Sequence, residues 1–107
     1  MFVQLKIEFL IPKEFNNGEK IPAILHAKTS NELGRQFGAY TEDPASLLGS
    51  WTDPKTKKKY KDENFTYWVL CDNTEDNMEF LSGFKERLKD RYKQLDILIY
   101  YIEVKRI

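Results

Sequence analysis

The chain has 107 residues, which is enough for one domain over residues 1–107 and leaves no room for a second. Its 17 lysine and arginine residues balance its 17 aspartate and glutamate residues, and this zero net charge argues against a dedicated nucleic-acid-binding or membrane-surface protein. Aromatic residues make up 14% of the chain and supply enough apolar area for one hydrophobic core, so disorder is not expected.

Cysteine usage and the N-terminal sequence indicate a cytoplasmic protein. The chain has a single cysteine, Cys71, so no internal disulfide is possible, whereas secreted domains of this size often carry several. The N-terminal sequence MFVQLKIEFL lacks the basic region, long apolar stretch and cleavage site of a signal peptide. No apolar run approaches the roughly 18 residues that a membrane-spanning helix needs.

The first predicted element is a strand over residues 2–11. Val3, Leu5, Ile7 and Phe9 alternate there with polar residues, and this period of two is typical of a strand with one buried face.

A helix is predicted over residues 20–37, after an Asn-Gly turn at residues 17–18. Its apolar residues recur at helical spacing, and Gly38 fits the C-terminal stop. The segment TSNE at residues 29–32 also fits a capping box. The alternative is therefore a loose turn followed by a helix from about Asn31.

Residues 38–53 are the least regular part and predict an interrupted strand, or two short strands, at the edge of a sheet. Extended pieces at residues 38–41 and 48–52 flank a turn at Pro44, and an edge tolerates such breaks. The Asp-Pro pair and the lysines of residues 53–62 indicate a hairpin tip.

The second half of the chain predicts strand, helix and strand. Residues 63–71 are apolar on both faces, as expected for a strand in the middle of a sheet or under a partner. Residues 74–93 predict a helix with Thr74 as its N-cap. Residues 95–107 predict another strongly apolar strand.

The order β-α-β-β-α-β predicts an α+β fold, a ferredoxin-like split sandwich in which a four-stranded antiparallel sheet carries two helices on one face. In this fold the first and third strands take the centre and the last strand lies at an edge. An exposed apolar edge is normally covered, so we expect a homodimer whose second copy covers the last strand. The alternative is that the C-terminal residues fold across the core.

Several short motifs are similar to a pattern found in short bacterial and phage proteins. The motifs are Phe37-Gly38-x-Tyr40-Thr41, Gly49-x-Trp51, Tyr60-x-Asp62-Glu63 and, before the last strand, Tyr92-x-Gln94. The family that the chain resembles is an uncharacterised one, a domain of unknown function with a ferredoxin-like arrangement. Its members more often have Gly-Gly where this chain has Gly38-Ala39. The resemblance implies the fold and implies no activity.

Motifs for metals and cofactors are missing from the sequence. With one histidine and one cysteine, the chain has neither His-x-x-x-His nor Cys-x-x-Cys, and its glycines form no phosphate-binding loop, so no metal or cofactor is predicted. His26 is interpreted as a partly exposed or hydrogen-bonded helix residue rather than a general base. Cys71 is interpreted as a small buried hydrophobic residue rather than a reactive thiol. Catalytic residues are not assigned.

A group of aromatic, hydroxyl and carboxylate side chains is the candidate for a ligand pocket between sheet and loop. The alternative is that Trp51 and Tyr40 close the edge of the core. The candidates are Tyr40, Thr41, Trp51, Tyr60, Asp62 and Trp68.

Five lysines form a local basic patch in the predicted hairpin. They are interpreted as residues that solvate the turn and protect the sheet edge. The alternative is contact with a nucleic-acid backbone, which the neutral net charge disfavours. The lysines are Lys55, Lys57, Lys58, Lys59 and Lys61.

Three functions are open on this basis. The first is a non-enzymatic, dimeric module that binds a protein partner or a small effector. The second is a small enzyme with a pocket between sheet and helices, using Tyr40, Trp51 or Asp62 and, at a distance, His26. The third is a single-stranded nucleic-acid binder that uses the lysine-rich hairpin. Fold alone does not choose among them, because this architecture hosts many unrelated functions.

Overall fold

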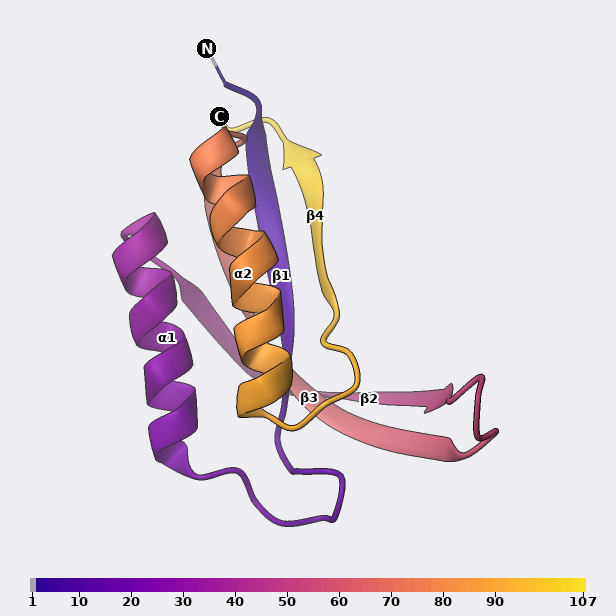
Figure 1. The fold of residues 1–107 in the computed structure, drawn as a ribbon. Coiled ribbons are helices and arrows are strands. Elements are labelled where there is room, and N and C mark those ends of the chain that lie inside the picture. The colour runs from indigo at the N-terminus through magenta and orange to yellow at the C-terminus, as the bar shows by residue number, and fades with distance from the viewer. Residues whose placement is uncertain (1) are drawn as a thin grey trace.

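The computed structural model describes residues 2–107. The elements follow the order β1 (Gln4–Pro12), α1 (Ala23–Phe37), β2 (Thr41–Thr52), β3 (Lys59–Asp72), α2 (Glu75–Arg91) and β4 (Ile99–Val104). The four strands form one antiparallel sheet in the order β2-β3-β1-β4. Both helices lie on one face of this sheet, and the end of the β2–β3 hairpin extends away from it (Figure 1). This is the ferredoxin-like α+β fold that the order of elements predicts, with β1 and β3 in the centre.

β1 is the strand around which the core is built. Leu5, Ile7, Phe9 and Ile11 alternate along it and are each 0% exposed, as the period of two predicts. The strand pairs with β3 on one side and with β4 on the other. Its backbone groups are therefore satisfied on both sides although its apolar side chains are completely buried.

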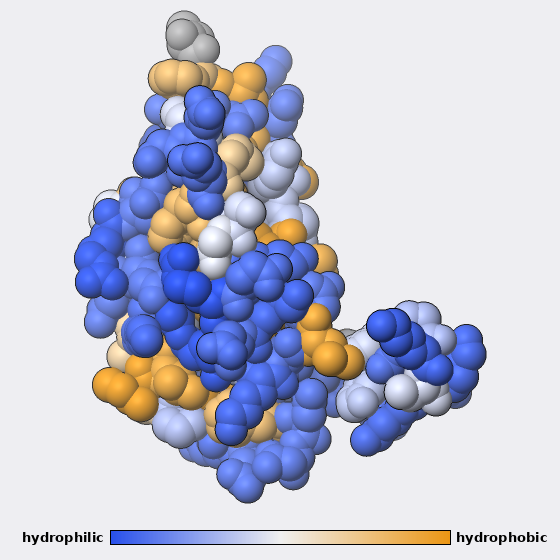
Figure 2. All heavy atoms as spheres, viewed as in Figure 1, coloured by the Kyte–Doolittle hydropathy of each residue, from blue (hydrophilic) through white to orange (hydrophobic). Residues whose placement is uncertain are grey.

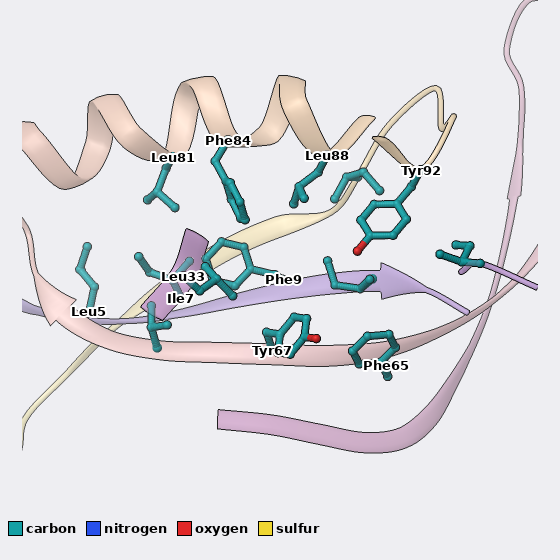
Figure 3. Packing of buried hydrophobic residues seen from close by; sticks show 14 residues of the cluster. Leu5, Ile7, Phe9, Leu33, Phe65, Tyr67, Leu81, Phe84, Leu88 and Tyr92 are labelled. Carbon is teal, nitrogen blue, oxygen red and sulfur yellow. The ribbon is translucent and has the colours of Figure 1, made fainter. Parts of the chain in front are cut away.

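The helices complete the core from one side. The ring of Phe84 in α2 meets Phe9 edge-on with centroids 5.6 Å apart, and Phe80 stacks on Phe84 at 4.9 Å. Leu33 of α1 is 0% exposed as well. Figure 3 shows Phe9, Phe84 and Leu33 converging in the layer between helices and sheet. Neither α1 nor α2, which are the helices of the described residues, is long and apolar enough to span a membrane.

α1 is a single helix from Ala23, so the alternative of a helix that starts near Asn31 is wrong. The hydroxyl of Thr29 does not cap a new helix but donates to the Leu25 carbonyl within α1, at 3.0 Å. Gly38 ends the helix as predicted. Its φ of 80° lies in the left-handed region that glycine adopts without strain.

α2 and β4 are shorter than the segments predicted for them. The N-cap of α2 is as expected, because the backbone N–H of Asn77 donates to the Thr74 hydroxyl at 3.2 Å. β4 covers Ile99–Val104, and residues 95–98 before it, which are apolar except for Asp96, belong to a loop. Hydrophobicity predicted a longer strand there, but the paired register with β1 ends at Phe9 and Ile99, and one further bond, from Leu10 N–H to the Leu98 carbonyl at 3.0 Å, precedes β4.

β2 confirms the prediction of one interrupted edge strand, whereas β3 corrects the prediction for the hairpin tip. β2 is one edge strand with a register shift between Asp43 and Leu47, rather than two separate pieces. The Nζ of Lys13 contacts this irregular stretch and donates to the Ser46 hydroxyl at 2.5 Å. β3 already starts at Lys59, so the hairpin tip is shorter than the predicted residues 53–62. Cross-strand pairing continues into the lysine-rich segment, which composition alone did not indicate.

A buried polar network ties the end of α2 to α1. Tyr92 is 0% exposed, and its hydroxyl oxygen lies 2.7 Å from Thr29 Oγ1 and 3.1 Å from His26 Nδ1. Arg91 donates to Thr29 at 2.8 Å and to the carboxylate of Glu32 at 2.6 Å. These contacts satisfy polar groups that would otherwise be costly to bury.

We expect Tyr92→Phe to lower the free energy of unfolding by about 1–3 kcal/mol, because Thr29 and His26 would lose a buried partner. Urea denaturation followed by circular dichroism measures this change. Tyr101→Phe is the matched control, because Tyr101 is 51% exposed. Equal effects of the two substitutions would show that the network contributes nothing to stability.

Candidate functional site

Residues 47–64 form the distal part of the β2–β3 hairpin and are termed the arm. Pairing resumes at Leu47 and Asn64 after the register shift. The tip is closed by hydrogen bonds from Asp53 N–H to the Lys58 carbonyl, at 2.9 Å, and from Lys57 N–H to the Asp53 carbonyl, at 2.8 Å. The arm stands apart from the body of the molecule and is mostly hydrophilic (Figure 2). Both of its faces can therefore border a hollow.

One face of the arm forms a hollow of about 380 Å³ with the loop of residues 92–98, and this hollow is termed the notch. Its size and its mixture of apolar and polar walls are those of small-molecule sites. The lining consists of Leu10 and Pro12 from β1, Gly49, Ser50 and Trp51 from β2, Asp62 and Asn64 from β3, and Gln94, Asp96, Ile97 and Leu98 from the loop.

Trp51 gives the notch a braced aromatic wall. It lies directly opposite Tyr60 in the ladder, and the two rings stack with centroids 4.6 Å apart and planes 17° apart. The Nζ of Lys58 lies 5.1 Å from the centroid of the Tyr60 ring. Stacked cross-strand pairs of this kind hold each other in place, so the indole is a preformed apolar surface.

The polar groups of the notch come from two sides. On the loop side, Asp96 pairs with Lys85 at 3.2 Å, and Gln94 donates to the Tyr92 carbonyl at 3.0 Å, so both side chains are held in position. On the arm side, Asp62 and Asn64 are two positions apart on β3, so they share one face of the strand, and both are half-buried. The notch thus offers a ligand carboxylate acceptors and an amide that can donate and accept.

The other face of the arm borders a second hollow of about 860 Å³, termed the lysine hollow. Its far wall is the loop after β1, in which Gly18 has a φ of 85° and donates its N–H to the Phe15 carbonyl at 2.9 Å. This confirms the turn predicted at residues 17–18. The lining comprises Pro12, Glu14, Phe15, Asn16, Gly18 and residues 48–50 and 58–63.

The predicted pocket candidates divide between several places. Trp51 and Asp62 line the notch, and Tyr60 and Asp62 line the lysine hollow. Thr41 is the first residue of β2 and Trp51 is the second to last, so the length of the strand separates them.

The remaining candidates pack on the sheet near the start of β2, outside both hollows. Thr41 lies opposite Trp68, and the Nζ of Lys6 lies 4.8 Å from the Trp68 ring centroid. The ring of Tyr40 meets Tyr67 edge-on at 5.6 Å. Burial, and then the nearby Glu42 carboxylate, raise the pKa of Tyr67, so this phenol is neutral at ordinary pH.

The five lysines also separate into two groups. Lys58, Lys59 and Lys61 line the lysine hollow. Lys55 and Lys57 belong to the tip, where Lys55 N–H donates to the Asp53 carboxylate at 2.8 Å and Lys57 has a φ of 63°.

The loop wall of the notch was not foreseen from the sequence. Gln94, Asp96 and Leu98 are far from Trp51 along the chain, and only the fold brings them together. The one sequence signal nearby was the Tyr92-x-Gln94 motif of the family resemblance.

His26 and Cys71 lie outside both hollows. His26 is half-buried and hydrogen-bonded, as its interpretation required, and burial lowers the pKa of its imidazole while Glu42 partly offsets this. Cys71 is half-buried rather than fully buried, and burial followed by the charge of Asp72 raises the pKa of its thiol. Within residues 2–107, no group of three or more His, Cys, Asp or Glu side chains is arranged to hold a metal ion.

Two solved structures are similar to this fold. A phage SAM lyase in complex with S-methyl-5'-thioadenosine has a TM-score of 0.72 at 11% sequence identity, over 96% of this chain and 83% of the other. The GlnK–ATP complex of B. subtilis has a TM-score of 0.59 at 14% identity, over 95% of this chain and 82% of the other. No protein-family model matches the chain, and no curated protein sequence matches it significantly. At these identities the similarity establishes the fold alone.

We expect stability to fall as the pH drops below about 6.5, because His26 has a lowered pKa in the folded chain. Between that lowered pKa and 6.5 the unfolded chain binds more protons at His26 than the folded chain does, so acid favours unfolding. Well above pH 6.5 the imidazole is neutral in both states, and no stability is lost there. Urea midpoints at about pH 7.5 and about pH 5.5 measure the change. In His26→Gln the decrease should be smaller, since the remaining decrease comes from other groups. An unchanged pH dependence in this variant would refute the assignment.

Proposed function

We propose that this protein is a non-enzymatic, self-associating module that binds a small effector, and that the notch is the effector site. The observation that carries the proposal is the indole of Trp51, braced by Tyr60 at the wall of a hollow of about 380 Å³. Asp62 and Asn64 supply polar groups beside it. A largely apolar hollow with a few fixed polar groups is the usual form of a small-molecule site.

We propose an adenine nucleoside as the class of effector. Both similar structures contain an adenosine derivative, S-methyl-5'-thioadenosine in one and ATP in the other. A purine suits the wall formed by Trp51, because stacking on an aromatic side chain contributes about 1–3 kcal/mol per base. The amide of Asn64 matches the hydrogen-bonding edge of a base, and the carboxylate of Asp62 can accept from ribose hydroxyls.

Self-association is proposed to bury β4 and the sheet face that the helices leave open. Tyr100 and Ile102 of β4 are 41% and 51% exposed, and Ile102 lies opposite Lys6 in the ladder. Lys6 and Glu8 lie 3.9 Å apart at the centre of this face. A second copy related by a two-fold axis can set Lys6 against the partner copy's Glu8 while it covers the surrounding apolar side chains.

The effector site is tested by titrating the protein with adenosine and with S-methyl-5'-thioadenosine by calorimetry. We expect saturable binding that Trp51→Ala weakens about five- to hundredfold, which corresponds to the loss of one stacking contact. Trp68→Ala is the matched control, because Trp68 lies outside the notch. Absence of saturable binding, or equal losses in the two variants, would refute the site.

The non-enzymatic part is tested separately with S-adenosylmethionine. Incubation with the wild-type chain, followed by chromatography, should return the compound unchanged. Release of S-methyl-5'-thioadenosine above the level of a protein-free control would favour the alternative of a small enzyme. The enzyme alternative placed its pocket in the layer between sheet and helices. Core side chains fill that layer (Figure 3), and neither the notch nor the lysine hollow lies in it.

Self-association is tested by light scattering at micromolar concentration. We expect a two-chain mass rather than the 12.7 kDa of one chain. Ile102→Lys should give the single-chain mass with an unchanged circular dichroism spectrum, because it places a charge in the apolar contact. Ile24→Lys, at a site 73% exposed on α1, should leave the mass unchanged. A single-chain mass for the wild type would exclude the proposed interface.

A further inference from the structure

We propose that the lysine hollow is a second ligand site, which binds a small polyanion carrying phosphate or carboxylate groups. This goes beyond the proposed effector site: the two hollows share Pro12, Gly49, Ser50 and Asp62, but the lysines proposed to bind lie on the face of the arm opposite Trp51. In the ladder, Ser50 lies opposite Lys61 and Trp51 lies opposite Tyr60. Side chains alternate along a strand, so Lys59 and Lys61 project away from the face that carries Trp51.

The burial of β3 agrees with this division of faces. Tyr60, Asp62 and Asn64 are half-buried, whereas Lys59, Lys61 and Glu63 between them are exposed. The lysine amines are thus accessible on the face that borders the lysine hollow.

The positive charge of this hollow is only partly neutralised by residues 2–107. The ion pairs among residues 2–107 use other cations, and none involves Lys58, Lys59 or Lys61. Glu63 is already engaged, since it accepts from the Ser46 hydroxyl at 2.7 Å and lies 3.8 Å from the Nζ of Lys13.

The other two carboxylates of the lining balance the lysines only in part. Asp62 lines both hollows, but along β3 it alternates with Lys59 and Lys61 and so lies on the face that carries Trp51. This leaves Glu14 as the carboxylate of the lining that lies beside Lys59 and Lys61 without a partner cation among the described residues. Lys59 and Lys61 therefore face one such carboxylate, and this side of the hollow has a local excess of positive charge although the whole chain is neutral. Lys58, directly before β3, lies on the other face, where its Nζ is 5.1 Å from the Tyr60 ring centroid.

The concave shape of the hollow strengthens the binding of an anion to these lysines. Its wall at residues 14–18 is a closed turn, held by the bond from Phe15 N–H to the Glu19 carbonyl at 2.8 Å. The Nζ of Lys93 packs over the Phe15 ring at 5.2 Å and helps to fix it. A concave surface surrounds an anion with the charges it carries, so an anion is held more strongly there than on a flat surface with the same lysines.

The dimensions favour a small polyanion over a nucleic-acid strand. A hollow of about 860 Å³ is at the upper end of the usual range for small ligands. Lys55 and Lys57 lie at the tip and outside the lining, so the lysines do not form a continuous track along the arm.

Calorimetry with tripolyphosphate and with citrate, at low salt, tests the site. We expect saturable binding of at least one probe, with an affinity that falls as salt is added. The double variant Lys59→Gln/Lys61→Gln should weaken binding about tenfold, because two charge-assisted contacts are lost. The matched double variant Lys55→Gln/Lys57→Gln removes the same charge from the tip and should stay within about twofold of the wild type.

Preference for tripolyphosphate would assign the site to phosphate ligands, and preference for citrate would assign it to carboxylates. Asn64→Ala, which alters the notch alone, should leave probe binding unchanged and so separates this site from the effector site. The proposal is overturned if neither probe binds saturably, if the two double variants lose affinity equally, or if Asn64→Ala abolishes binding.

Discussion

The burial of β1 between its two neighbouring strands and beneath α2 is the constraint on which the rest of the structure depends. Its four alternating apolar side chains are fully buried, and each contributes about 1.5–3 kcal/mol relative to an exposed position. The paired register with β3 ends at Pro12 and Asn64, and one further backbone bond, from Lys13 N–H to the Glu63 carbonyl at 2.9 Å, follows it. β3 runs on from there paired with β2 alone among the strands of the described residues. The arm exists because β3 is longer than the central strand beside it.

The separation of chemistry on the arm follows from the pleat of that two-stranded ribbon. Aromatic and half-buried polar residues alternate with lysines along β3, so they fall on opposite faces. The loop after α2 closes one face and the loop after β1 closes the other, which makes two hollows of different character. The proposed effector and polyanion sites are thus two consequences of one strand alternation.

Net charge is a property of the whole chain, whereas ligands respond to the local field. The balance of 17 basic and 17 acidic residues argued against binding large polyanions, and it holds for the chain as a whole. Within the fold, Arg91 and Lys13 are paired with Glu32 and Glu63, while the lysines of the arm have no such partners among the described residues. Local excess charge therefore arises from which cations are paired.

The sequence by itself determined the order of elements and hence the ferredoxin-like fold, along with the alternation of β1, the Thr74 N-cap and the Gly38 stop. Each of these depends on residues only a few positions apart, so local patterns are sufficient to predict them. Only the tertiary structure decided that Lys59 and Lys61 belong to a strand, that Trp51 and Gln94 share a notch, and that Tyr40 and Thr41 lie away from it. Those placements depend on strand register, on how far β3 extends past its last pair with β1, and on the packing of distant loops. No local pattern encodes these three quantities.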